Sequence, residues 1–102
     1  MIEITPRQRE LARHALGFDG RQKFSTRNYF VAGVVDLPDW EELVRKGLAD
    51  TGAPTELTGG DPVYWCRREL ALFVRERDEH LDREFRDGSE IKRAYDGRRA
   101  AV

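Results

Sequence analysis

The stretch DWEELVRKGLADTGAPTELTGGDPVYWC, residues 39–66, indicates most about the fold of this chain. In its first part, apolar residues recur at the three- and four-residue spacing of one helix face, and Gly47 can supply the left-handed residue that ends a helix. Acidic residues occupy the first turn, where the positive end of the helix dipole favours them. We therefore predict a short amphipathic helix over Asp39–Lys46, with Asp36 as an alternative start.

The second part of the stretch predicts a β-hairpin. Thr55–Thr58 and Val63–Cys66 have the length of short strands, and turn residues stand between them. In this turn, residues 59–62 (GGDP), two glycines can supply the positive φ that a tight turn requires. Pro62 is tolerated at the start of a strand. We expect the two strands to pair and the turn to project from the domain.

Helices are predicted on both sides of this unit. Thr5, Pro6 and Gln8 form the pattern of a capped helix start with proline in the first turn. Gly17 can end that helix. On the other side, the spacing of apolar residues predicts a long helix over Arg67–Arg86. This charge-rich helix could also pair weakly with a second copy, as the arm of a homodimer.

The segment Phe24–Gly33 has two interpretations. Ser25 or Thr26 could cap a short helix, whereas residues 29–31 (YFV) have the propensity of a strand. We expect either a short helix or an extended segment at this place.

Together these elements predict an α+β fold, a small winged-helix-like domain with the β-hairpin as its wing. At 102 residues the chain suits one domain, which buries roughly two thirds of the surface of the unfolded chain. We assign residues 1–87 to this domain, including its long C-terminal helix, and residues 88–102 to a short charged tail. No stretch approaches the ~20 apolar residues that a membrane-spanning helix needs.

The distribution of charge separates the hairpin unit from the rest of the chain. Charged residues make up 36% of the sequence, against about 25% in an ordinary domain, yet the formal net charge is only −1. Residues 36–66 carry seven acidic side chains against two basic ones, whereas the segments before and after them carry more basic than acidic residues. The acidic block therefore coincides with the predicted helix and hairpin.

Catalytic and metal-binding patterns are missing from the sequence. The chain has one cysteine, Cys66, and two histidines, without the spacing of a zinc site. A nucleophile pair of Cys66 with His80 is conceivable, but the sequence gives it no further support. The glycine-rich residues 57–61 lack the Lys-Ser/Thr of a phosphate-binding loop. We expect no enzyme activity, no metal and no cofactor.

DNA binding is the usual function of a winged helix, and the acidic block argues against it here. In the common docking mode, the helix ahead of the hairpin enters the major groove and the wing contacts the backbone. That helix would present Asp39, Glu41 and Glu42, which DNA phosphates repel. The wing offers Asp61 and no lysine or arginine. Nucleic acid is therefore the less expected partner.

A DNA-binding transcriptional regulator remains the alternative interpretation, through a different surface. Arg9, Arg13 and Arg27 could form a basic face on the first helix and the segment after it. These arginines could equally form ion pairs with acidic residues of the same chain, or simply be solvated.

Binding to another protein is the preferred interpretation. Asp39, Glu41, Glu42 and Asp61 could imitate the phosphates of a nucleic acid and occupy the positive groove of a protein that handles nucleic acid. Tyr64 could serve as an apolar anchor, since tyrosine is common among the residues that dominate interfaces.

Four motifs resemble a loosely defined group of small uncharacterised proteins encoded in phages and prophages. They are TPRQRELARHALG (residues 5–17), RNYFVAG (27–33), DWEELVRKGL (39–48) and LTGGDPVYW (57–65). In proteins of this kind the last strand tends to continue into a threonine-led helix (VTEAG-like), whereas this chain has CRRE at residues 66–69.

The resemblance implies a context and no functional residues, because the group has no settled activity. It implies a mobile-element protein in a bacterial cytoplasm, where small acidic phage proteins often bind a host protein. Anti-CRISPR inhibitors, which block nucleic-acid channels, are among them. We therefore expect a non-enzymatic protein that binds a host protein, plausibly an inhibitor of a nucleic-acid-processing complex.

Overall fold

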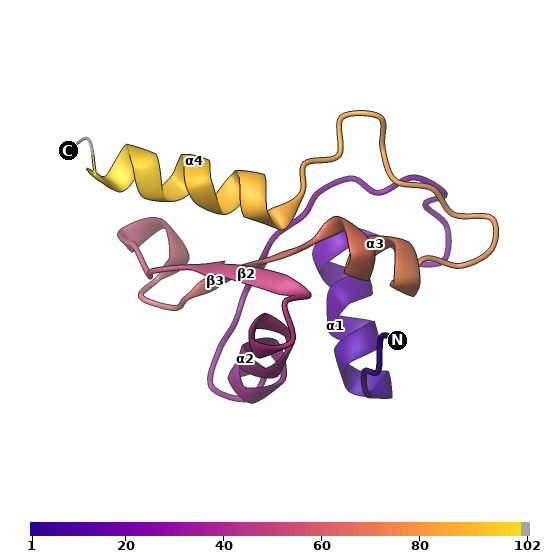
Figure 1. Ribbon diagram of the computed structural model, residues 1–102, viewed down its shortest axis with the longest axis horizontal. Coiled ribbons are helices and arrows are strands. Elements are labelled where there is room, and N and C mark those ends of the chain that lie inside the picture. The colour runs from indigo at the N-terminus through magenta and orange to yellow at the C-terminus, as the bar shows by residue number, and fades with distance from the viewer. Residues whose placement is uncertain (101–102) are drawn as a thin grey trace.

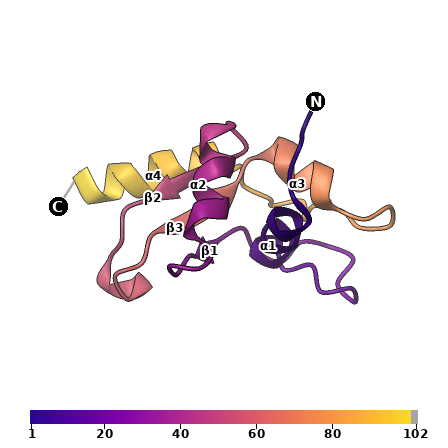
Figure 2. The same cartoon turned by 90° about the horizontal axis from the view of Figure 1, so that it is seen from below.

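Helices cover both faces of a small antiparallel sheet. The computed structural model describes residues 1–100, and the side chains of residues 1–98. In Figure 1 and Figure 2, α4 covers one face of the sheet while α1 and α2 lie against the other. The predicted α+β class is confirmed. In chain order the elements are α1 (Pro6–Leu16), β1 (Phe30–Val31), α2 (Leu37–Arg45), β2 (Ala49–Gly52), the single 3₁₀ turn η1 (Glu56–Thr58), β3 (Val63–Cys66), α3 (Arg68–Val74) and α4 (Gly88–Ala100).

The two ends of α1 confirm the sequence prediction. The Thr5 hydroxyl accepts a hydrogen bond from the Gln8 amide at 3.0 Å, and the Gln8 side chain accepts one from the Thr5 amide at 2.9 Å. Gly17 follows with φ 84° and donates its N–H to the His14 carbonyl. Both ends of the helix are therefore satisfied locally, and its buried face is available for the core.

Helix α2 begins earlier than Asp39, at the alternative start. Asp36 is its N-cap residue, and Pro38 lies in the first turn, where a missing N–H is tolerated. Regular helix ends at Arg45, and Gly47 then adopts φ 74°. Trp40 and Leu43 are fully buried and direct this helix against the sheet.

Of the two strands predicted for the hairpin, Val63–Cys66 is confirmed as β3, whereas Thr55–Thr58 is not a strand. Strand β3 pairs with β2, not with Thr55–Thr58, and with β1 on its other edge, so that the strand order is β1-β3-β2. Ala, Asp and Gly have low strand propensity, which explains why the sequence did not predict Ala49–Gly52 as a strand. Thr55–Thr58 cannot pair because its residues bond to one another within a turn.

Aromatic rings join α2 to the sheet. The rings of Trp40 and Tyr64 stack at 5.4 Å between centroids with an interplanar angle of 20°. The Phe30 ring lies 5.5 Å from Trp40 and brings β1 into the same cluster. Trp40 and Tyr64 have no exposed surface, so this contact forms the centre of the core.

The predicted long helix over Arg67–Arg86 is wrong. Helix α3 stops at Val74, and Arg75 turns to extended backbone with φ −69° and ψ 147°. The apolar spacing is interrupted at residues 77 and 78, so a continued helix would gain little burial there. The chain between α3 and α4 is irregular, and the dimer arm that this helix was predicted to form does not exist.

Residues 88–100, predicted as part of a charged tail, form α4; residues 101–102 of that tail lie outside the described residues. The helix packs closely because two glycines give it room. A Cβ at Gly52 would lie 2.6 Å from the Trp65 ring and 2.7 Å from the Tyr95 ring, and a Cβ at Gly88 would lie 2.7 Å from the Trp65 carbonyl oxygen. The Tyr95 hydroxyl donates to the Ala53 carbonyl at 2.5 Å, just beyond the end of β2.

The segment Phe24–Gly33 is extended, the second of its two predicted conformations. Asn28 joins it to the sheet, because its side-chain amide accepts from the Cys66 N–H and donates to the Cys66 carbonyl, both at 2.8 Å. The same amide donates to the Arg86 carbonyl at 3.0 Å. Phe24 itself is 56% exposed and does not belong to the core.

We expect Gly88→Ala to lower the free energy of unfolding by about 1–3 kcal/mol, because the added methyl group has no space against the carbonyl groups of β3. Gly97→Ala, in the same helix, is the matched control. A Cβ at Gly97 meets nothing within 4 Å, so alanine there should be neutral or stabilising by up to about 1 kcal/mol. Urea denaturation measures both variants, and equal effects would contradict the close packing of α4.

Candidate functional site

The predicted acidic residues lie on α2 and on the loop of residues 53–62 between β2 and β3. In Figure 2 this loop projects from the sheet at the lower left, and the first turn of α2 lies nearer the middle of the molecule. We call the side chains of Asp39, Glu41, Glu42, Glu56 and Asp61 the acidic surface. Hydrogen bonding divides these five carboxylates into two kinds.

Glu41 is bonded to a buried tyrosine. The Tyr64 hydroxyl donates to the Glu41 carboxylate at 2.5 Å. Tyr64 is fully buried, and burial, followed by the hydrogen bond to Glu41, raises the pKa of its hydroxyl. The prediction that Tyr64 anchors a partner is therefore wrong, because a side chain without exposed surface cannot contact one.

Glu42 is bonded to α1. Its carboxylate accepts a hydrogen bond from the Gln8 side chain at 2.9 Å and lies 3.4 Å from the Lys46 ammonium group. The Gln8 bond, followed by the Lys46 contact, lowers the pKa of Glu42. Gln8 is itself buried, so Glu41 and Glu42 both help to hold α2 in place.

The second kind of carboxylate on the acidic surface has no bond to the rest of the described domain, and it comprises Asp39, Glu56 and Asp61. Within the described part of the chain, none of their side chains has an ion-pair or hydrogen-bond partner. Glu56 and Asp61 are exposed, and Asp39 is half-buried. Sequence reasoning did not include Glu56, although its place beside the Gly-Gly turn was a usable signal. These three carboxylates are the part of the acidic surface that remains available to a partner.

The alternative DNA-binding residues are occupied by contacts within the chain. Arg13 binds Glu79 through two hydrogen bonds, at 2.6 and 2.9 Å, and also donates to the Val74 carbonyl. The Arg13 side chain is 14% exposed and that of Glu79 only 2%. The bond from Arg13 lowers the pKa of the Glu79 carboxyl group despite its burial. This pair connects α1 to the irregular segment after α3.

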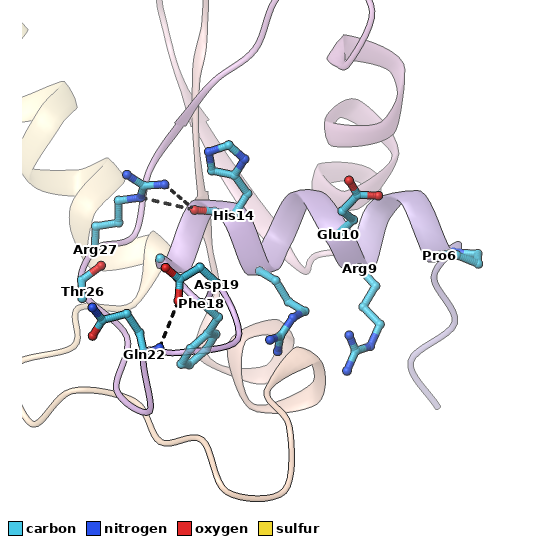
Figure 3. A pocket seen from close by; sticks show the side chains of 11 residues that line it. Pro6, Arg9, Glu10, His14, Phe18, Asp19, Gln22, Thr26 and Arg27 are labelled. Carbon is cyan, nitrogen blue, oxygen red and sulfur yellow. Dashed lines mark hydrogen bonds between the residues drawn. The ribbon is translucent and has the colours of Figure 1, made fainter.

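Arg9 and Arg27 are also engaged. Arg9 lies 3.2 Å from the Glu76 carboxylate. Arg27 donates to the His14 carbonyl at the end of α1, at 2.8 and 3.3 Å, as the dashed lines in Figure 3 show. A hollow of about 690 Å³ runs along α1, and all three arginines line it. Because two of them are neutralised by carboxylates, they do not form a continuous basic surface.

The cysteine of the conceivable Cys66–His80 pair lies in an environment that disfavours its thiolate. Cys66 is fully buried, and burial raises the pKa of its thiol, whereas a reactive cysteine needs a lowered one. His14 and His80 contact the rings of Phe30 and Phe24 respectively. Among the described residues, no group of three or more His, Cys, Asp or Glu side chains could hold a metal ion.

Comparison with protein-family models, with curated proteins and with solved structures gives no match to this chain. Within residues 1–100, no helix is long and apolar enough to cross a membrane.

We expect Glu79→Gln to lower the free energy of unfolding by about 3 kcal/mol, because it leaves Arg13 without its buried partner. Glu76→Gln is the matched control, since its pair with Arg9 is exposed and contributes no more than about 1 kcal/mol. Urea denaturation at neutral pH compares the two variants.

The pH dependence gives a second test of the same pair. The folded protein holds the pKa of Glu79 below the ordinary glutamate value of about 4.3. Its contribution is therefore complete above that value and is lost as the pH falls through the lowered pKa. The difference between wild type and Glu79→Gln should shrink in acid, and a constant difference would contradict the ion pair.

Proposed function

We propose that this is a non-enzymatic phage or mobile-element protein that binds a host protein in the bacterial cytoplasm. Its acidic surface imitates the phosphates of nucleic acid and occupies a positive groove of a nucleic-acid-processing complex, as an anti-CRISPR-like inhibitor does. The observation that carries the proposal is that Asp39, Glu56 and Asp61 have no side-chain partner within the described chain. Glu56 and Asp61 are exposed and Asp39 is half-buried, so their charge can meet a positive surface.

The local balance of charge supports this function. The loop of residues 53–62 contains Glu56 and Asp61 and no lysine or arginine. On α2, Lys46 is paired with Glu42, which leaves Arg45 as the unpaired cation of residues 36–62 in the described structure. Potential from grouped like charges attracts a partner of opposite charge and accelerates the encounter. The resemblance to phage-encoded proteins supplies the biological setting.

A winged-helix transcriptional regulator is the second candidate, and the sheet favours it. The strand order β1-β3-β2, with α1 and α2 on one face, agrees with a winged-helix arrangement in which α2 is the recognition helix and residues 53–62 are the wing. The charges oppose this use, because the recognition helix would bring Asp39 toward phosphates and the wing would add Glu56 and Asp61. We therefore place this function second.

We expect Asp39→Lys combined with Asp61→Lys to weaken binding to the host polypeptide by tenfold or more, that is by about 1.4 kcal/mol. The thermal melt should fall only slightly, because neither side chain has an ion pair or hydrogen bond to lose in the described structure and Asp39→Lys removes only a favourable charge from the first turn of α2, worth about 0.3–1 kcal/mol. Binding is measured by retention of host polypeptides on the immobilised protein. Glu69→Lys with Glu90→Lys is the matched control, because both residues are exposed and lie outside the acidic surface. Equal retention by the two double variants would contradict the proposal.

We also expect the wild-type protein to leave random duplex DNA unshifted in a gel at low salt, because the acidic surface repels phosphates and Arg9, Arg13 and Arg27 are engaged within the chain. A shift that weakens steeply with salt and is lost in Arg9→Gln and Arg27→Gln would instead support the regulator. Arg13 is left unchanged in this test because of its buried pair with Glu79.

A further inference from the structure

The loop of residues 53–62 is held in one conformation by bonds among its own residues. The Thr58 hydroxyl accepts from the Thr55 N–H and donates to the Thr55 carbonyl, both at 2.9 Å. The Gly60 N–H donates to the same carbonyl at 3.1 Å, and Gly59 and Gly60 have positive φ values of 67° and 88°. The turn η1 is therefore ordered without using any apolar contact.

At the centre of this turn, Leu57 is 99% exposed. Every polar group that fixes the turn belongs to its neighbours, so the leucine side chain contributes nothing visible to folding. An exposed leucine on a mobile loop is ordinary. On an ordered turn it is already placed for burial against a partner, with little conformational entropy left to lose.

We propose that Leu57 is the apolar anchor of the interface, and that it enters an apolar pocket rimmed by lysine or arginine on the partner protein. Charge complementarity identifies this kind of partner, because Glu56 precedes the anchor, Asp61 follows it, and neither has a side-chain partner in the described chain. Interfaces of this kind bury a central apolar side chain inside a polar rim. The flanking carboxylates disfavour an anionic membrane or a nucleic acid as the occupant.

This inference rests on the proposed function and names the chemistry of its partner. It also gives Leu57 the role of apolar anchor, which the sequence had suggested for Tyr64. Tyr64, on β3, is buried against Trp40 and Glu41, whereas Leu57 lies on the loop of residues 53–62 and its side chain is exposed to solvent.

The test uses the full chain and a host polypeptide as the probe. The probe is the polypeptide that wild type and the Glu69→Lys, Glu90→Lys control both retain from host lysate; it is then purified for titration calorimetry with each variant. Leu57→Ala should weaken its affinity by roughly tenfold, since a buried leucine loses most of its contact surface, and Leu57→Asp should weaken it further. Val34→Asp is the matched control, because Val34 is 87% exposed and lies outside the loop. Thermal melts of all three variants should match wild type.

The outcomes separate the inference from the function on which it rests. Wild-type affinity in Leu57→Asp, with the charge variant still defective, would overturn the anchor and leave the acidic surface intact. Loss of affinity in Leu57→Asp but not in the charge variant would keep the anchor and remove the phosphate mimicry. No retained polypeptide would overturn both. Sedimentation of the pure protein checks the remaining occupant, because self-association abolished by Leu57→Asp would make a second copy the ligand.

Discussion

The fold depends on the burial of β3 on both faces. All four residues of Val63–Cys66 are buried, and alternation along a strand sends Tyr64 toward α2 and Trp65 toward α4. A strand of this kind is stable only if both faces are covered. The helices on one side and α4 on the other therefore both pack on β3, which is the element that the two layers share.

The acidic residues illustrate how one chemical group serves two purposes. Glu41 and Glu42 accept hydrogen bonds from Tyr64 and Gln8, which stand on the sheet and on α1. The side chains of Asp39 and Asp61 have no hydrogen-bond or ion-pair partner among the described residues. Residue type and spacing are alike for both kinds, so only the position of neighbouring donors distinguishes a carboxylate that holds the fold from one that is free to bind.

Local signals in the sequence predicted local structure. The Thr5–Gln8 cap and Gly17 are properties of a few adjacent residues, and the structure has them as expected. Strand β2 could not be predicted in this way, because Ala49–Gly52 has little strand propensity and gains its conformation from pairing with β3. The break after Val74 lies beside the interruption of the apolar spacing at residues 77 and 78, but the course of the chain beyond it depends on Arg13, which holds Glu79 from a distant helix. The α+β class was thus predictable, while the strand pairing and the course of the chain after α3 were not.

In the candidate site, too, the sequence predicted which residue types are present but not which of them are buried. The sequence identified the acidic residues of α2 and the turn, but burial alone shows that Tyr64 is inside and Leu57 outside. Both are apolar residues next to the same Gly-Gly turn, and no propensity separates them. A rule based on residue type chooses the larger aromatic ring, and that choice was wrong.

The hydrogen bond from Tyr95 to the Ala53 carbonyl has a mechanical consequence. Residue 53 is the first residue of the loop that carries Leu57. The bond from α4 therefore helps to fix the orientation of that loop relative to the sheet. Proteolysis or a bulky fusion near Tyr95 would leave the helical layer on the opposite face unchanged. It would nevertheless loosen the geometry of the loop of residues 53–62, more than thirty positions earlier in the chain.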